Sequence, residues 1–258
     1  MHWSRIAQYI SNCFALALII RLLILRLHTV YRVFCLFLLW ELLASGILML
    51  GGLDYRLSWM GTRIVSWVLS LYMVYALLEA VLATFPGILR FSRRALNVTF
   101  TLAVLLALLT AFPEYSASAL TGSSNPIDRA LGVAFVLERA ISLAALLALL
   151  SILGFILWFP IRMPRNLAIF SVGYVIYFAA KTALLLARSY LAPERSDLFS
   201  VVLNVILTGC FIYWIMLISR QGEIARVQIG HSWHLVEQKR LIGQLEAINT
   251  ALLRASRR

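Results

Sequence analysis

Seven stretches of mostly apolar residues divide this chain, and they constrain its fold more than any other feature. They cover residues 6–26, 33–52, 61–84, 97–113, 130–159, 167–189 and 198–219. A helix needs about 20 such residues to cross the hydrocarbon core of a bilayer. With 62% hydrophobic and 13% charged residues, the chain is also far more apolar than soluble domains are. The pattern therefore predicts an all-α, polytopic membrane bundle of about seven transmembrane helices.

Turn-forming residues separate these stretches, and they set the expected ends of the helices. Pro86 follows the third stretch, and the Gly-, Ser-, Asn- and Pro-containing segment 121–126 follows the fourth. We expect every proline, Pro113 included, to lie at a helix end or in a loop. The seventh helix is expected to continue to about Ile229, before Gly230.

The distribution of Lys and Arg predicts the orientation of the bundle, because cytoplasmic flanks carry the excess of basic residues. With the N-terminus outside, 15 basic residues fall on the inner side: Arg21, Arg26, Arg32, Arg90, Arg93, Arg94, Arg162, Arg165, Arg220, Arg226, Lys239, Arg240, Arg254, Arg257 and Arg258. Six fall on the outer side: Arg5, Arg56, Arg63, Arg129, Arg188 and Arg195. We therefore expect the N-terminus outside and the C-terminus in the cytoplasm.

The composition excludes several other classes of protein. The net charge of +12 does not indicate a nucleic-acid-binding protein, because the basic residues lie between apolar stretches and in the tail. The expected partner is the lipid bilayer. Cys13, Cys35 and Cys210 lie inside apolar stretches and are expected to pack as small apolar side chains. Because no residue set has metal-ligand spacing and no paired nucleophile and base is visible, we expect no cofactor, no metal and no enzymatic activity.

Residues 220–258 differ from the bundle region, residues 1–219, in being amphipathic and rich in charge. Their apolar stripe is spaced by 4, 3 and 4 residues: Leu241, Leu245, Ile248 and Leu252. This spacing predicts a basic cytoplasmic tail helix over about residues 232–256. Such a helix can lie on the inner leaflet, pack under the bundle or pair with a helix of a partner protein.

Alanine recurs at every fourth position in three stretches, which places small side chains on one face of each helix. The trios are Ala103, Ala107 and Ala111; Ala140, Ala144 and Ala148; and Ala179, Ala183 and Ala187. Small side chains let helix backbones approach closely. These faces therefore predict packing inside the bundle or contacts between copies in a homo-oligomer.

Polar residues inside the apolar stretches are the candidates for a site, because each ionisable group there costs about 2.5–3.5 kcal/mol on insertion scales. They are Glu41, Glu138, Arg139, Tyr174, Lys181 and Asn204. Tyr174 and Lys181 are seven residues apart and share a helix face. The economical hypothesis is one buried polar cluster in the outer half, with Lys181 and Arg139 facing Glu138 and Glu41.

The sequence leaves three interpretations of this cluster open. It can consist of structural ion pairs that fix the packing, form a ligand-binding or sensing pocket open to the outside, or belong to a transport or proton path. Transporters often build their sites from helices broken by Gly or Pro, so helices expected to be continuous weigh against transport. A retinal-binding lysine is not indicated, because microbial rhodopsins carry it on the last helix and residues 198–219 contain none.

Short motifs resemble a family of uncharacterised bacterial seven-helix inner-membrane proteins. They include Asp54-Tyr55-Arg56 before Trp59, and Leu137-Glu138-Arg139 in the fifth stretch. The resemblance implies a multi-pass protein of the bacterial inner (cytoplasmic) membrane and no known activity. The architecture is also similar to the seven-helix input modules of bacterial signalling proteins. We therefore expect a receptor- or sensor-like or scaffold protein, with a small-solute or proton-coupled transporter or an accessory subunit of a larger membrane complex as alternatives.

Overall fold

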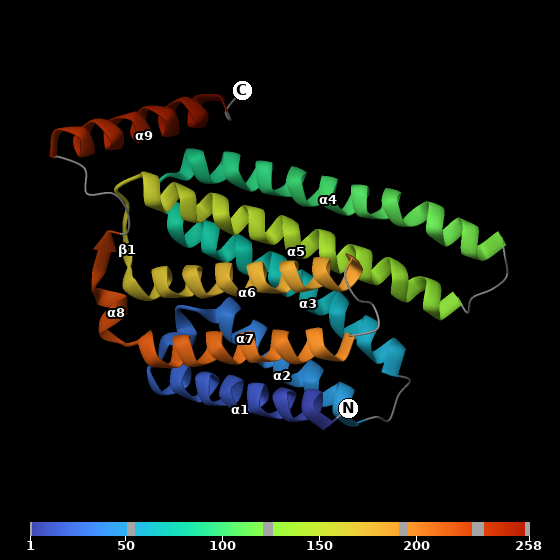
Figure 1. Ribbon diagram of the computed structural model, residues 1–258. Helices are drawn as coiled ribbons and strands as arrows, with labels where there is room; N and C mark the ends of the chain where they lie inside the picture. Colours follow the sequence, from blue (N-terminus) through green and yellow to red (C-terminus); the bar gives the residue numbers. More distant parts are fainter. Residues whose placement is uncertain (1, 51–54, 121–125, 191–195, 229–234, 256–258) are drawn as a thin grey trace.

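The computed structural model describes residues 2–50, 55–120, 126–190, 196–228 and 235–255, and within them the chain is almost entirely helical (Figure 1). The long helices of the bundle are α1 (His2–Ile24), α2 (Arg32–Leu50), α3 (Tyr55–Leu82), α4 (Pro86–Leu120), α5 (Pro126–Trp158), α6 (Arg165–Tyr190) and α7 (Ser196–Leu217). The shorter elements are η1 (Leu27–Thr29), β1 (Arg162–Pro164), α8 (Gln221–Ile224), β2 (Arg226–Gln228) and the tail helix α9 (Leu235–Ala255). Each of the seven long helices contains a segment long and apolar enough to cross a membrane. The predicted seven-helix architecture is confirmed at that level.

Not every proline lies at a helix end or in a loop, as the sequence predicted. Pro86 and Pro126 each begin a helix, a position where the missing N–H removes no hydrogen bond. Pro113, however, lies inside α4, which continues to Leu120. The expectation that every proline lies at a helix end or in a loop is therefore wrong for Pro113. Proline removes one intrahelical hydrogen bond and strains the preceding turn, and here the helix continues across that defect.

The seventh helix also ends earlier than predicted, at Leu217 rather than near Ile229. The chain then forms α8 and the strand β2, which pairs antiparallel with β1 so that Arg162 lies opposite Gln228. The Arg165 N–H donates to the Ala225 carbonyl over 3.0 Å and extends this connection. Local periodicity cannot reveal such a pairing, because its two strands are about 60 residues apart in the sequence.

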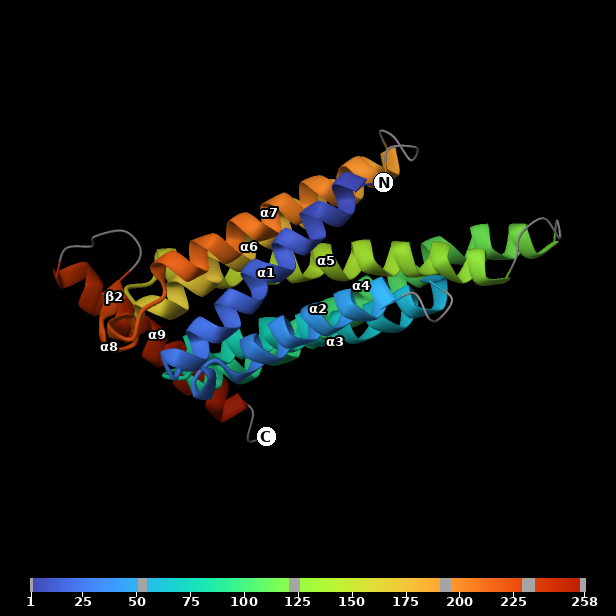
Figure 2. The same cartoon turned by 90° about the horizontal axis from the view of Figure 1, so that it is seen from below.

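The seven long helices alternate in direction, so the bundle has two distinct ends (Figures 1 and 2). The N-terminal end is the one at which α1 begins, and the tail end is the one that carries α8 and α9. Alternation brings the described basic residues of the predicted inner side to the tail end, whereas Arg257 and Arg258 lie outside the described residues. Toward the N-terminal end, α1 and α7 diverge from α2 and α3 (Figure 2). Which side of a membrane each end faces stays a prediction.

Aromatic side chains fill the bundle interior between α2, α6 and α7. The Phe34 ring centroid lies 4.4 Å from that of Phe170 and 5.1 Å from that of Trp214. Tyr174 and Trp214 are also 5.1 Å apart, and both are only 1% exposed. A Cβ added at Gly173 would lie 2.4 Å from the Trp214 indole nitrogen, so this glycine allows the ring to pack directly against α6.

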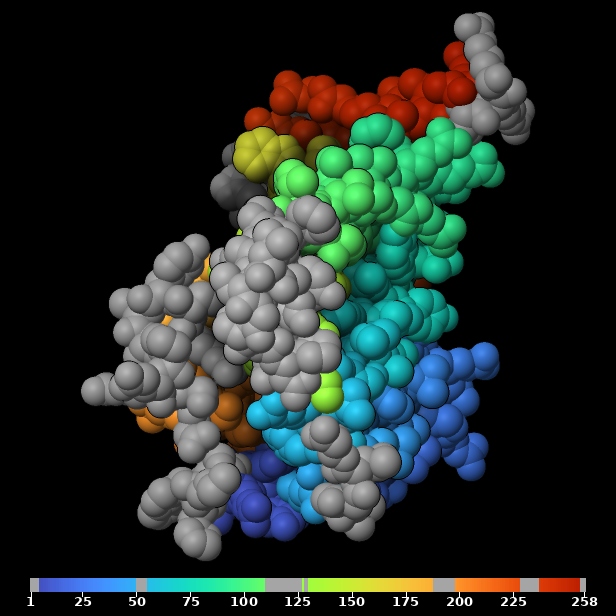
Figure 3. Space-filling model, turned by 90° about the vertical axis from the view of Figure 1, so that its right-hand side faces the viewer, coloured from blue at the N-terminus to red at the C-terminus, as the bar shows by residue number. Residues whose placement is uncertain are grey.

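The tail helix α9 crosses the tail end of the bundle and packs against α4 (Figures 1 and 2). Figure 3 looks onto the N-terminal end and shows α9 (red) beyond α4 (green), on the side opposite α1 and α2 (blue). Leu241 and Leu245 of the predicted apolar stripe are 8% and 2% exposed. The side-chain oxygen of Asn249 accepts hydrogen bonds from the N–H groups of Gly87, over 2.6 Å, and Ile88, over 3.3 Å. It therefore satisfies backbone donors that the first turn of a helix leaves free.

The alanine faces differ in how far the bundle covers them. Ala107 of α4 and Ala144 and Ala148 of α5 are buried, so these two faces pack within the chain. Ala183 of α6 is exposed, and the side chain of Ala111 lies outside the described residues. A homo-oligomer formed through an alanine face stays a prediction.

Candidate functional site

A buried ion pair joins α5 and α6 in the half of the bundle toward the N-terminal end. The Lys181 ammonium lies 3.0 Å from Glu138 Oε1, and the two side chains are 8% and 6% exposed. One residue farther along α6, the Thr182 hydroxyl lies 3.1 Å from that of Ser142. The pairing of Lys181 with Glu138 is the one that helix faces suggested, and a buried ammonium needs such a counterion.

Arg63 of α3 extends this ion pair into a network. Its Nη1 lies 3.8 Å from Glu138 Oε1, and its guanidinium carbon lies 5.5 Å from the centre of the Trp59 ring. That distance is typical of a cation–π contact. The Arg63 Nε–H is buried and has no hydrogen-bond partner within the described part of the chain. This one donor is closed off, whereas the Arg63 side chain as a whole is 30% exposed.

A cavity of about 310 Å³ lies beside Arg63, between α1, α2, α3, α6 and α7. It lies where α1 and α7 separate from α2 and α3 (Figure 2). Its polar lining consists of Gln8, Ser11, Asn12, Glu41, Ser45, Tyr55, Thr62, Arg63, Ser66, Tyr177, Ser200 and Asn204. Below, this space is called the polar cavity.

Glu41 brings a carboxylate to the polar cavity opposite the positive charge of Arg63. The Ser66 hydroxyl donates to Glu41 Oε1 over 3.0 Å and accepts a hydrogen bond of the same length from the Trp40 indole N–H. This chain orients the carboxylate between α2 and α3. Only one hydrogen bond to Glu41 is found among the described residues, so a carboxylate with room for about four acceptor contacts can still accept from a bound molecule.

Helix α1 also supplies polar groups to the cavity, although none of the six residues predicted for the polar cluster lies on this helix. The Gln8 and Asn12 amides both donate to the Ser45 hydroxyl, over 3.0 Å and 2.7 Å. Gln8 and Asn12 are four residues apart, so they share one face of α1. That spacing is the signal that would have assigned this helix to the site.

The six residues predicted for the polar cluster occupy four different places. Glu41 and Asn204 line the polar cavity, and Lys181 and Glu138 lie behind it and reach it through Arg63. Tyr174 belongs to the aromatic core instead. Arg139 is half-buried and makes no ion pair with the residues that the structure describes.

The position of Arg63 is the main feature that the sequence did not predict. The third helix was expected to begin at residue 61, which placed Arg63 at the membrane edge. The helix begins at Tyr55, so Arg63 lies eight residues from the first residue of the helix, about 12 Å along its axis at 1.5 Å per residue. A charge at that depth requires a partner, and Glu138 is within reach.

The groups that line the polar cavity are hydrogen-bond donors and acceptors, two opposite charges and aromatic rings. The polar cavity combines a guanidinium, a carboxylate, amide and hydroxyl groups, and the aromatic rings of Tyr55 and Trp59. Among the described residues, no three His, Cys, Asp or Glu side chains lie close enough together to hold a metal ion.

Comparisons of the chain with models of protein families, with characterised proteins and with solved structures find no match.

Proposed function

We propose that this protein is a receptor-like membrane protein whose polar cavity binds a small solute carrying both a positive and a negative charge. The observation that carries the proposal is the presence of Arg63 and Glu41 in the lining of one cavity. The Arg63 side chain is 30% exposed, and the Glu41 carboxylate accepts one hydrogen bond from the described residues. Arginine recognises carboxylates through its planar fork of donors. Glu41 would accept from an ammonium group.

The size and the remaining lining of the cavity support a solute about as large as an amino acid. A volume of about 310 Å³ is at the lower end of the range of small-molecule sites. Trp59 and Tyr55 add aromatic faces, which attract cations such as a quaternary ammonium. The Gln8, Asn12 and Asn204 amides would supply directed hydrogen bonds.

The position of the cavity suggests how binding would reach the tail end. A solute held by Arg63 of α3 and by the α1 and α7 walls would draw together helices that diverge at this end. Helix α7 leads directly into α8 and the β1–β2 pair, and α9 follows. The exposed side chains of α9, among them Ile248 and Arg240, would then contact a partner protein in the cytoplasm of a bacterial cell.

Transport through the same cavity is the alternative function, and the packing on its tail side weighs against it. Phe211 and Tyr177 line the cavity, and Phe211 also packs against Trp214. The buried aromatic core continues from there toward the tail end. A transporter would have to open this core in every cycle, whereas a receptor can keep it closed.

The experiment is a binding measurement on the purified chain in lipid nanodiscs. Thermal unfolding is followed with a panel of zwitterions (amino acids and betaines), matched anions and matched uncharged amides. We expect a zwitterion to stabilise the protein in a saturable manner. Arg63→Gln and Glu41→Gln should each weaken that binding by about 10- to 100-fold, because each removes a charged hydrogen-bond partner.

Arg240→Gln is the matched control, because it removes an exposed arginine on α9, and it should bind like the unchanged protein. If no zwitterion stabilises the protein, or if both cavity variants bind as well as the control, the proposal is wrong. Uptake of the bound zwitterion into proteoliposomes would assign the cavity to transport instead.

A further inference from the structure

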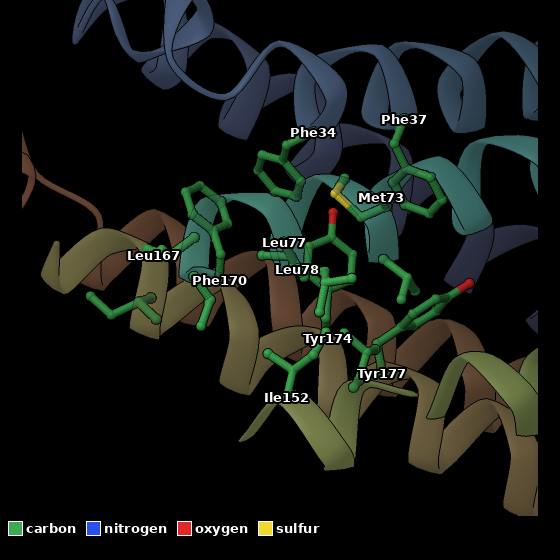
Figure 4. Packing of buried hydrophobic residues seen from close by; sticks show 14 of the residues in the cluster. Phe34, Phe37, Met73, Leu77, Leu78, Ile152, Leu167, Phe170, Tyr174 and Tyr177 are labelled. Carbon is green, nitrogen blue, oxygen red and sulfur yellow. The ribbon is translucent and has the colours of Figure 1, made fainter. Parts of the chain in front are cut away.

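A second cavity lies at the tail end, and its lining is mostly apolar. It has a volume of about 170 Å³ and lies between α2, α3 and α6. Its walls include Phe34 of α2, Met73 and Leu77 of α3, and Phe170 and Tyr174 of α6 (Figure 4). Below, it is called the apolar cavity. No residue lines both this cavity and the polar cavity.

One hydrogen-bonding group in this lining, the Tyr174 hydroxyl, lacks a partner among the described residues. Tyr174 is 1% exposed, and its hydroxyl has no hydrogen-bond partner within the described part of the chain. The hydroxyl points in among Phe34, Phe37 and Met73 (Figure 4), which leave almost none of its surface accessible. A buried hydroxyl without a partner is costly, and native proteins satisfy most such groups. The Tyr174 hydroxyl therefore indicates that a further atom accepts its hydrogen bond.

The other tyrosine of this lining is satisfied, which makes Tyr174 distinct. The Tyr31 hydroxyl donates to Glu223 Oε2 over 2.7 Å at the tail-end edge of the cavity. Burial raises the pKa of the Tyr31 phenol, and the hydrogen bond to the Glu223 carboxylate raises it further, so this phenol keeps its proton. Asn166, which is fully buried, donates to the Ser219 carbonyl over 2.8 Å and holds α8 in place beside this edge.

We propose that the apolar cavity binds a small molecule made of one planar ring that carries a carbonyl oxygen. This oxygen accepts a hydrogen bond from Tyr174 when the flexible Met73 side chain, which lies beside the hydroxyl, moves aside. An engineered apolar cavity of about 150 Å³ is large enough for benzene, so about 170 Å³ suits one ring with a short substituent. Aromatic walls favour a planar ring, because offset and edge-to-face contacts stabilise it. A carbonyl satisfies the Tyr174 donor and brings no proton that would itself need a partner.

The test uses two fluorinated probes of nearly equal size, 4-fluoroacetophenone and 1-ethyl-4-fluorobenzene, which differ in the carbonyl. Binding to the full chain in lipid nanodiscs is followed by fluorine NMR, with empty nanodiscs as the background for partition into lipid. We expect saturable binding of both probes, with the ketone bound more tightly. In Tyr174→Phe the ketone should bind about tenfold more weakly, because one hydrogen bond is lost, whereas the ethyl probe should bind at least as well as before.

Two filled variants show whether the signal comes from this cavity. Ala76→Leu and Ala80→Leu each add bulk to its α3 wall, and Ala80 is exposed, so its variant should fold even if the other does not. Either folded variant should lose saturable binding of both probes. No saturable binding above the empty nanodiscs would overturn the cavity assignment. Equal ketone affinity in Tyr174→Phe and the unchanged protein would overturn the role of the carbonyl, and would leave water as the partner of the hydroxyl.

Discussion

The two cavities extend from the middle of the bundle toward its opposite ends, and they differ in how their polar groups are satisfied. In the polar cavity, side chains from α1, α2 and α3 bond to one another across helix boundaries, as Gln8 does with Ser45 and Ser66 with Glu41. At the apolar cavity, one tyrosine hydroxyl is enclosed by aromatic rings and a methionine side chain (Figure 4) and has no partner in the described structure. A buried polar network in which every group has a hydrogen-bond partner fixes the geometry of its side chains. A buried polar group without a partner destabilises the fold instead.

Helix α6 contributes to both cavities, and the contrast arises one turn apart along it. Tyr177 lines the polar cavity and Tyr174 lines the apolar one. Residues three apart lie near one another on the helix surface, so α6 alone cannot determine the polarity of either space. The neighbouring helices do so, through Arg63 and Glu41 toward one end and Phe34 and Met73 toward the other.

The largest effect that we predict is a loss of stability when the buried ion pair behind the polar cavity is removed. Lys181→Met removes the ammonium that lies 3.0 Å from Glu138, and the nearest cation that remains beside this buried carboxylate in the described structure is Arg63, at 3.8 Å. Removing one partner of a buried ion pair typically costs about 3–5 kcal/mol. We expect an unfolding free energy in detergent lower by that amount, measured by denaturant titration.

Two further variants give this prediction its controls. Lys239→Met changes an exposed lysine on α9 and should lie within about 0.5 kcal/mol of the unchanged protein. Combining Lys181→Met with Glu138→Gln removes both charges, so it should recover part of the loss. If Lys181→Met is as stable as Lys239→Met, the ion pair does not hold α5 and α6 together.

A second prediction addresses the close packing of the tail half. Gly173→Ala would place a Cβ 2.4 Å from the Trp214 ring, where no space remains. Overpacking a core costs about 1–3 kcal/mol, and we expect that loss of unfolding free energy. Gly61→Ala on α3 is the matched control toward the other end, because nothing lies within 4 Å of its added Cβ. Equal stability of the two variants would mean that the interior around Gly173 is packed no more tightly than the surroundings of Gly61.

The sequence could predict the helices and the pairing of Lys181 with Glu138, because both follow from general requirements of a bilayer. A spanning helix must be apolar, and a buried ammonium must find a carboxylate. The sequence could not place Arg63, since its depth depends on a helix start six residues earlier than the hydropathy suggested.

Tyr174 shows a different limit. Its seven-residue spacing from Lys181 predicted a shared face, but two helical turns separate the residues by about 10.5 Å along the axis. Tyr174 therefore lines the apolar cavity, although it shares a helix face with Lys181. Arg139 illustrates the same point around the axis, since it is rotated by about 100° from Glu138 and does not take part in the ion pair.

A third, smaller prediction concerns the contact between the tail helix and the bundle. Asn249→Ala removes the oxygen that accepts from the Gly87 and Ile88 N–H groups at the start of α4. Losing such a cap costs about 0.5–2 kcal/mol. We expect faster hydrogen exchange in α9 and in the first turn of α4, measured by mass spectrometry, with the cavities unaffected. Gln244→Ala, at an exposed position on α9, should leave exchange unchanged, and equal exchange in both variants would show that Asn249 does not hold the helix in place.

The smallest predicted effect has the opposite sign and tests the contrast between the cavities most directly. Tyr174→Phe deletes a buried hydroxyl that has no partner in the described structure. In protein freed of lipid and of the fluorinated probes, this variant should therefore be more stable than the unchanged protein by about 1 kcal/mol. Tyr31→Phe deletes a hydroxyl that donates to Glu223, and it should become less stable by about 1 kcal/mol, the typical net contribution of a hydrogen bond. Both changes remove one oxygen from a tyrosine of the same lining, so the difference in sign isolates the bonding state of the hydroxyl. Should both variants lose stability in denaturant titrations, the Tyr174 hydroxyl already has a partner, and the apolar cavity would be satisfied in the same way as the polar one.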